Sequence, residues 1–104
     1  RIGQTFEGVI SSVTPWGMYV ELPNTVEGMI HVTNLRDDYY HYNETAHELV
    51  GEAKGNCYKL GQKLQVVVAD ANTMMRTIDF VLPEDAVAFG LDAAPEDIGQ
   101  YQAE

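Results

Sequence analysis

The sequence predicts an all-β domain, built as a small closed barrel of five antiparallel strands. Three observations support this prediction. Five segments combine residue types that favour strands with an alternation of apolar and polar positions. No segment shows a convincing helical period. The alternation also breaks in the first two segments, and such breaks mark the bulges and bends that let a sheet close on itself.

The first strand is expected over Gly3–Thr14, which is rich in Phe, Val, Ile, Ser and Thr. Alternate residues keep a period of two from Phe6 to Ile10, but the next apolar residue, Val13, comes three positions later. This change of step predicts a bulge or strong coiling, because one extra residue moves the following side chains to the other face. Pro15 then ends the strand, since proline cannot donate to a sheet ladder.

The second strand lies in Thr14–Leu22, the stretch around which the chain is organised. Its expected inward residues are Met18, Val20 and Leu22. Trp16 and Tyr19 are three apart, so a regular strand would place them on opposite faces. A bulge at Gly17 would bring both rings to the solvated face, where unpaired nucleic-acid bases could stack on them. The alternative is that Trp16 caps one end of the barrel and Tyr19 is ordinary half-buried surface.

The third strand is expected over Val26–Val32, after a turn at residues 23–25. Its inward residues would be Ile30 and Val32, and its outward residues would be Glu27, Met29 and His31. Residues 33–35 leave room for no more than one turn of helix. Residues 37–58 are interpreted as an insertion of short strands with a turn at Lys54–Asn56.

The last two strands form a hairpin with a turn at residues 72–75. The fourth strand begins after Gly61, and its inward positions Leu64, Val66 and Val68 alternate with Lys63, Gln65 and Val67. The fifth runs over Arg76–Leu82, and its inward residues are Ile78, Phe80 and Leu82. Residues 1–82 therefore form the predicted barrel domain.

Residues 83–104 are expected to be a flexible, acidic C-terminal tail. This segment has few large apolar residues, no usable period and no Lys or Arg, while it holds 6 acidic residues. A short helix over Glu84–Phe89 is the alternative, although a helix of that length is rarely stable alone.

Composition limits the function classes. The 104 residues suit one domain, and the first residue is Arg1, so we expect a piece of a longer protein. The chain has 6 basic and 16 acidic residues, a net charge of −10, which argues against long-range attraction to phosphate. Residues 1–82 account for 6 basic and 10 acidic residues, or −4. The single Cys57 excludes a disulfide framework and fits the cytoplasm, and no apolar run is long enough to span a membrane.

Five segments resemble, in order and spacing, an RNA-binding domain of the ribosomal-protein S1 (S-one) type. They are Gly8–Ile10, Trp16–Val20, Glu27–Val32, Gly61–Val66 and Arg76–Phe80. The resemblance covers Ile2 to about Leu82. It implies a five-stranded oligonucleotide-binding (OB) barrel with single-stranded RNA as its partner.

Further segments resemble the C-terminal S1 domain of the ribonuclease R family. They are Ile10–Thr14, Asp37–Tyr40, Gly51–Glu52 and Ile78–Phe80, and Glu21–Thr25 is similar to the Gram-positive members. This resemblance implies a parent enzyme that degrades RNA hydrolytically from its 3′ end. The fragment itself would be a monomer without catalysis or a cofactor, and its partners would be RNA and the parent's catalytic domain.

The resemblance also implies roles for individual residues. The RNA face would be lined by Trp16, Tyr19 and His31, and Asn72 would follow the fourth strand. The basic residue that opens the fifth strand corresponds to Arg76 or Thr77: the family's Arg or Lys falls at Thr77, and Arg76 is one step away. Lys63 and Arg76 are the expected phosphate contacts. Thr33 stands where serine is usual, and the acidic C-terminal segment replaces one that is often lysine-rich.

Other kinds of site find little support in the sequence. Asp37–Asp38 lacks the further oxygen ligands of a metal site, and three histidines with one cysteine have no zinc-like spacing. No nucleophilic triad or carboxylate cluster for two-metal nuclease chemistry is present. Tyr39, Tyr40 and Tyr42 could either extend the stacking surface or pack the insertion onto the barrel. The rival function is a protein-interaction or structural module, which the charge of −10 favours.

Overall fold

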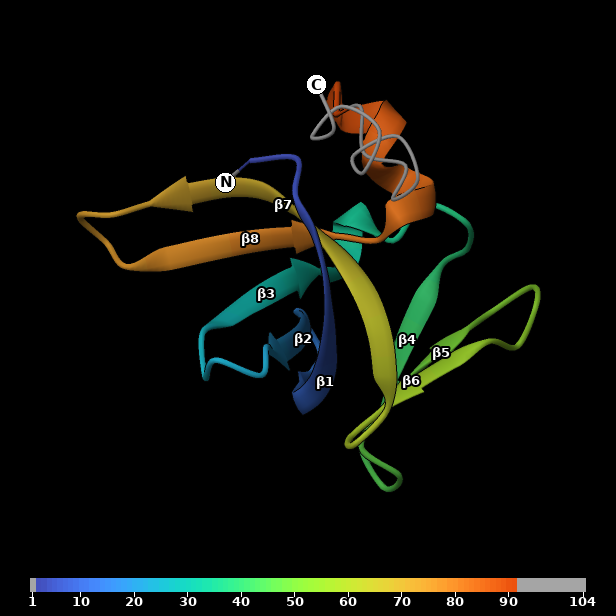
Figure 1. Ribbon diagram of the computed structural model, residues 1–104. Helices are drawn as coiled ribbons and strands as arrows, with labels where there is room; N and C mark the ends of the chain where they lie inside the picture. Colours follow the sequence, from blue (N-terminus) through green and yellow to red (C-terminus); the bar gives the residue numbers. More distant parts are fainter. Residues whose placement is uncertain (1, 92–104) are drawn as a thin grey trace.

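The computed structural model describes residues 2–91 of the chain. Five strands close into a barrel in the order β1-β2-β3-β8-β7, and three more form a small separate sheet in the order β4-β5-β6 (Figure 1). The barrel strands are β1 (Thr5–Thr14), β2 (Gly17–Glu21), β3 (Glu27–His31), β7 (Lys63–Asn72) and β8 (Thr77–Val81). The small sheet comprises β4 (Tyr40–Asn43), β5 (Glu48–Gly51) and β6 (Cys57–Lys59). Two 3₁₀ helices, η1 (Val32–Asn34) and η2 (Pro83–Phe89), complete the fold.

The predicted five-stranded barrel is confirmed, but one pairing differs from the fully antiparallel prediction. The strands β3 and β8 run parallel, with Met29 opposite Asp79, while the other neighbouring pairs of the barrel are antiparallel. The reason is parity. Strand direction cannot alternate at every step around a closed ring of five, so at least one neighbouring pair must be parallel.

Irregularities in pairing lie where the barrel bends. The predicted bulge in the first strand is confirmed, because the register of β1 against β2 shifts between Ile10 and Ser12. A second shift lies between Val68 and Asp70 in β7. The predicted bulge at Gly17 was wrong: Gly17 is the first residue of β2 and pairs regularly with β1 and β3. Irregularities like those in β1 and β7 strengthen the local twist, which helps a small sheet to close.

The core of the barrel contains most of the inward residues that the alternation predicted, although Leu64 and Ile78 are only partly buried against it. Its buried members are Ile10, Met18, Val20, Leu22, Ile30, Leu35, Leu49, Val66, Val68, Phe80 and Leu82. Val32, predicted to be an inward strand residue, instead begins η1 and is partly buried against this core. The opposite, outward faces of the barrel strands carry the candidate site.

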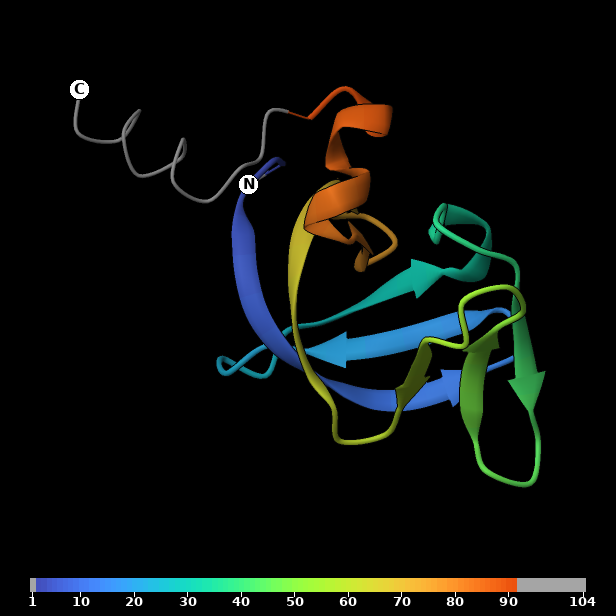
Figure 2. The ribbon, with the colours of Figure 1, turned by 90° about the vertical axis from the view of Figure 1, so that its right-hand side faces the viewer.

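The predicted insertion of short strands is confirmed as the β4–β6 sheet, which lies beside the barrel (Figure 2). Leu49 of β5 is fully buried in the main core. The rings of Tyr40 and Tyr58 lie 5.5 Å apart, and the Tyr40 hydroxyl donates to Asp37 at 3.0 Å. Burial, followed by the hydrogen bond to Asp37, raises the pKa of Tyr40. These two tyrosines therefore pack the insertion onto the barrel.

The expectation of a flexible tail from residue 83 was wrong for its first part. Residues 83–89 form η2, which packs against β7 (Figures 1 and 2). Ala86 is 1% exposed and covers Val67 and Val81, which are both fully buried. The helix is stable because it buries apolar side chains of the barrel, which its own sequence does not reveal. The remainder of the predicted tail, residues 92–104, lies outside the described residues.

Candidate nucleic-acid interface

The outward faces of β2, β3 and β8 surround a shallow hollow of about 400 Å³. It is lined by Tyr19, Glu27, Gly28, Met29, His31, Arg76, Thr77, Ile78 and Asp79. Three predicted RNA contacts, Tyr19, His31 and Arg76, thus come together from three separate segments. We call this hollow the β-face hollow. Its volume lies within the range of roughly 300–1,000 Å³ found for ligand pockets.

Strand alternation accounts for this gathering of side chains. Tyr19 pairs with Met29 of β3, and Met29 in turn pairs with Asp79 of β8, so the three side chains share one outward row. His31 pairs with Gly17, which has no side chain. The half-buried Met29 provides an apolar floor between the ring of Tyr19 and the polar groups of β8.

Trp16 lies in the turn before β2, at the edge of this face. The residue is 71% exposed, so it does not cap the barrel. Its backbone N–H donates to Thr14 Oγ1 at 3.2 Å, and its carbonyl accepts from the N–H of Val32 at 2.8 Å. Gly17, with φ 156°, permits close approach of the turn to β3, because a Cβ there would overlap the carbonyl oxygen of Ile30. The ring is thus held on a fixed backbone.

The charges around the β-face hollow are mixed. The imidazole Nε2 of His31 lies 3.2 Å from Asp79 Oδ1, and Glu27 accepts a 2.6 Å hydrogen bond from the hydroxyl of Ser11. Arg76 is the basic residue of the lining, against two carboxylates. Charge attraction therefore contributes little to the binding of a phosphate chain here. The aromatic rings are the main groups through which this surface could bind RNA.

The remaining predicted contacts lie at the hairpin and on another face. Asn72 ends β7, and its Oδ1 accepts from the N–H of Met75 at 2.9 Å, which shapes the β7–β8 turn. Arg76 lies in that turn with a left-handed backbone, φ 58°, and both Arg76 and Thr77 line the hollow. Lys63 does not join them: it lines a different hollow, between β1 and the β2–β3 turn, together with Glu7 and Glu21.

Comparisons with known proteins identify the family of this chain. The sequence profile of the S1 RNA binding domain matches residues 1–80. The chain belongs to the S1 RNA-binding domain family. This S1 domain is 43% identical over 80 residues to ribonuclease R 1 of Lactococcus lactis, covering 77% of this chain and 10% of that protein. Ribonuclease R of Escherichia coli is 36% identical over 105 residues, covering 100% of this chain and 12% of that protein.

A solved structure shows the same likeness in three dimensions. Mycoplasma genitalium RNase R, in complex with ribose-methylated single-stranded RNA, matches with a TM-score of 0.73 and 27% identity. The match covers 78% of this S1 domain and 13% of that chain. GSP13 of Bacillus subtilis matches at a TM-score of 0.59 with 15% identity, which shows the fold alone. The S1 domain therefore spans roughly a tenth of the length of the ribonuclease R proteins that it matches.

Two residues of the face were predicted to point outward but were given no role in the site. Glu27 and Met29 share the outward parity of His31, and both line the β-face hollow. Asp79 could not be paired with His31 in this way, because 48 positions separate them. Within residues 2–91, no group of His, Cys, Asp and Glu side chains is arranged to hold a metal ion. Nor is any helix in that range long and apolar enough to cross a membrane.

Proposed function

We propose that this S1 domain binds single-stranded RNA as the C-terminal substrate-binding domain of a ribonuclease R-type enzyme, a hydrolytic 3′–5′ exoribonuclease. The observation that carries the proposal is the convergence of Tyr19, His31 and Arg76 on one hollow beside the exposed ring of Trp16. Base–aromatic stacking is worth roughly 1–3 kcal/mol per base and tolerates any sequence. The domain would hold the incoming strand and lengthen the time that the substrate spends on the enzyme.

The relatives support this role. Ribonuclease R from two distant bacteria resembles the domain at 36–43% identity, and the matching Mycoplasma structure holds single-stranded RNA. The catalytic domain of the same polypeptide would be its second partner. We propose no catalysis by the domain itself: RNA incubated with the purified chain and magnesium should stay intact, and release of nucleotides by stringently purified protein would contradict this.

The test of RNA binding uses the single tryptophan of the chain. Adding a short oligouridylate should quench the fluorescence of Trp16 in a saturable manner. Stacking should also make the affinity weakly dependent on salt, with a log–log slope of about −1.4 to −2 for two or three phosphate contacts at roughly −0.7 each. Arg76 is the phosphate contact that lines the hollow, and Lys63 would require the strand to continue over β1.

A second function, protein interaction, is favoured by the net charge of −10 and by the carboxylates of Glu27 and Asp79 on the same face. An acidic surface of this kind would suit a basic protein partner better than a phosphate chain. The two functions differ in one measurement. Absence of Trp16 quenching by RNA at every salt concentration would favour the protein-interaction module.

A further inference from the structure

A further exposed aromatic residue, besides Trp16 and Tyr19, follows η1 in the chain. Tyr39 is 81% exposed, in the connection between η1 and β4. It borders a second hollow, of about 580 Å³, which we call the η1 hollow. Its lining comes from residues 32–40 and includes Val32, Arg36, Asp37 and Asp38.

The two hollows have no lining residue in common, but they meet in the sequence: His31 lines the β-face hollow and the next residue, Val32, lines the η1 hollow. The turn that holds Trp16 is bonded to the start of η1, since the Trp16 carbonyl accepts the N–H of Val32 at 2.8 Å. This bond ties the backbone of the stacking residue Trp16 to the segment that lines the η1 hollow.

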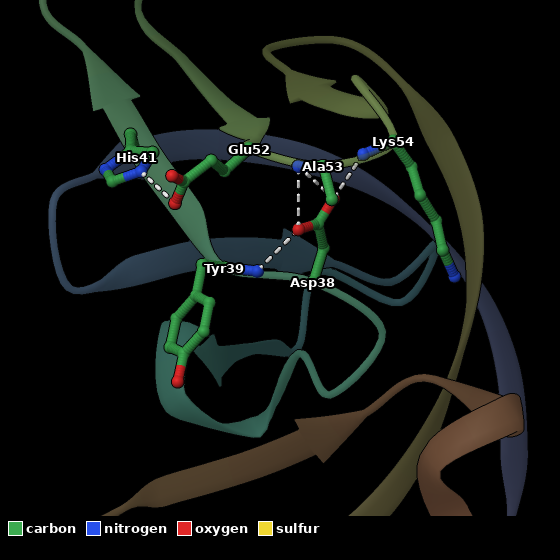
Figure 3. A network of polar contacts seen from close by, with 6 residues as sticks. All are labelled: Asp38, Tyr39, His41, Glu52, Ala53 and Lys54. Carbon is green, nitrogen blue, oxygen red and sulfur yellow. Dashed lines mark hydrogen bonds and ion pairs between the residues drawn. The ribbon is translucent and has the colours of Figure 1, made fainter.

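The backbone on both sides of Tyr39 is fixed. The N–H of Tyr39 donates to Asp38 Oδ1 at 2.7 Å, and its carbonyl accepts from the N–H of Glu52 at 2.7 Å. Asp38 also accepts from the N–H groups of Ala53 and Lys54 (Figure 3). The phenol ring points away from this network in Figure 3. An exposed ring on a rigid backbone loses little conformational freedom on binding, which favours stacking.

Gly51 is required for this arrangement. A Cβ at this position would lie 2.6 Å from Asp38 Oδ2, so a larger residue would displace the carboxylate that holds Tyr39. The loop is thus built around the Asp38 carboxylate, and the exposed ring is a consequence of that structure.

The charges of the η1 hollow are compatible with a nucleotide. Asp38 accepts backbone N–H groups, of which those of Lys54 and Ala53 contribute most to lowering its pKa, and Asp37 accepts the hydroxyl of Tyr40. Both carboxylates therefore have hydrogen-bond donors within the protein, although they keep their negative charge. Arg36 is exposed in the same lining and presents a guanidinium. The hollow thus combines an open ring with a cation suited to phosphate.

We propose that the η1 hollow is a second nucleotide subsite, in which a base stacks on Tyr39 and a neighbouring phosphate contacts Arg36. This inference rests on the proposed RNA binding at Trp16, Tyr19 and His31, and it extends the bound strand along η1 toward the β4–β6 sheet. The ligand is single-stranded RNA rather than a protein, because the ring, the cation and the adjacent stacking surface match one continuous polynucleotide.

The test compares a short and a long oligouridylate of about 3 and 8 nucleotides, since OB folds cover roughly 4–16. In the full 104-residue chain, Tyr39→Ala should leave the affinity for the short RNA unchanged. It should weaken the long RNA roughly 5- to 150-fold, the equivalent of one base–aromatic stack. Tyr39→Phe should restore the affinity. Arg36→Gln should reduce the salt slope for the long RNA by about 0.7.

His41→Ala is the matched control, because His41 is exposed two residues away in β4, pairs with Glu52 and lines a different hollow. It should change neither affinity, and melting curves should show that each variant is folded. Equal affinity of Tyr39→Ala and the unaltered chain for the long RNA would overturn the subsite. Failure of the short RNA to quench Trp16 in the unaltered chain would instead overturn the proposed function, so the two failures are distinct.

Discussion

The imidazole Nε2 of His31 lies 3.2 Å from Oδ1 of Asp79, so a carboxylate from β8 contacts the histidine of the proposed RNA face. Both side chains are partly exposed, at 45% and 40%. The contact joins β3 to β8 beside the parallel pairing that closes the barrel. It fixes the imidazole, but it also places a negative charge where phosphates would pass.

The first prediction concerns that charge. Asp79→Asn keeps a hydrogen-bonding group beside His31 and removes the repulsion of phosphate. RNA affinity at low salt should rise by up to roughly fivefold, in line with about 1 kcal/mol for an exposed charge interaction. The gain should shrink in higher salt, because the Debye length falls to about 8 Å at 0.15 M. Fluorescence titrations at two salt concentrations measure both effects, and weaker binding at low salt would contradict the prediction.

The second prediction concerns the stacking rings. Trp16→Ala and Tyr19→Ala should each cost roughly 1–3 kcal/mol of RNA affinity, while His31→Ala should cost less. Thermal stability should change little, because the rings are 71% and 37% exposed and their loss leaves no internal cavity. Binding is best followed by anisotropy of a labelled RNA, since one variant lacks the tryptophan. A Trp16→Ala protein that melts far below the parent, or that binds RNA equally well, would exclude the stacking role.

The third prediction separates two truncations of the C-terminal segment. Ending the chain after Leu82 removes η2 and uncovers Val67 and Val81, each fully buried. Burial of a valine is worth roughly 1.5–3 kcal/mol, so the free energy of unfolding should fall by a few kcal/mol. Ending it after Leu91 keeps this cluster, which makes that variant the control. Equal denaturant midpoints for the two truncations would show that η2 does not stabilise the barrel.

The fourth prediction concerns RNA binding by the variant that ends after Leu91. Residues 92–104 contain four acidic residues and no Lys or Arg. Their removal should tighten RNA binding modestly at low salt, because four negative charges no longer repel phosphate. The gain should fade as salt rises. A truncation after Leu91 that binds RNA less tightly than the full chain at low salt would refute this expectation.

The fifth prediction concerns Asp85 of η2, which is 7% exposed and whose Oδ2 has no hydrogen-bond partner. Burial raises the pKa of Asp85 above its ordinary value of 3.8, although the backbone N–H of Arg36 acts in the opposite direction. Between the two pKa values the folded state binds more protons than the unfolded state. Stability is therefore lost as the pH rises through this window.

Asp85→Asn should consequently raise the Tm at pH 7, because the amide keeps an acceptor for Arg36 without a buried charge. A gain of about 1 kcal/mol corresponds to roughly 4–8 °C for a domain of this size. The difference between variant and parent should shrink as the pH falls toward the ordinary pKa of 3.8. Melting curves across this range provide the measurement, and a difference that grows on acidification would reverse the argument.

Much of the fold could be predicted because it is encoded by neighbouring residues. The alternation in β2 and β8 identified buried Met18 and Phe80, and the change of step after Ile10 identified the bulge in β1. The grouping of Trp16, Tyr19 and His31 came from the family resemblance, and the outward positions of Tyr19 and His31 followed from strand parity. Each of these features depends on a few consecutive side chains.

Other features were decided by the closed structure. Val67 was expected to point outward, and it does so, yet η2 buries it together with Val81. Lys63 was grouped with Arg76 by chemistry, but the barrel separates them into different hollows.

By itself, then, the sequence determined the strands, their inward faces and the family, because the local period of apolar residues and short motifs specify them. Only the tertiary structure decided which distant segments meet. The parallel step between β3 and β8 and the contact of His31 with Asp79 both depend on closure of the barrel. The physical reason is that burial of apolar surface from all strands at once sets closure, and no local stretch contains that information.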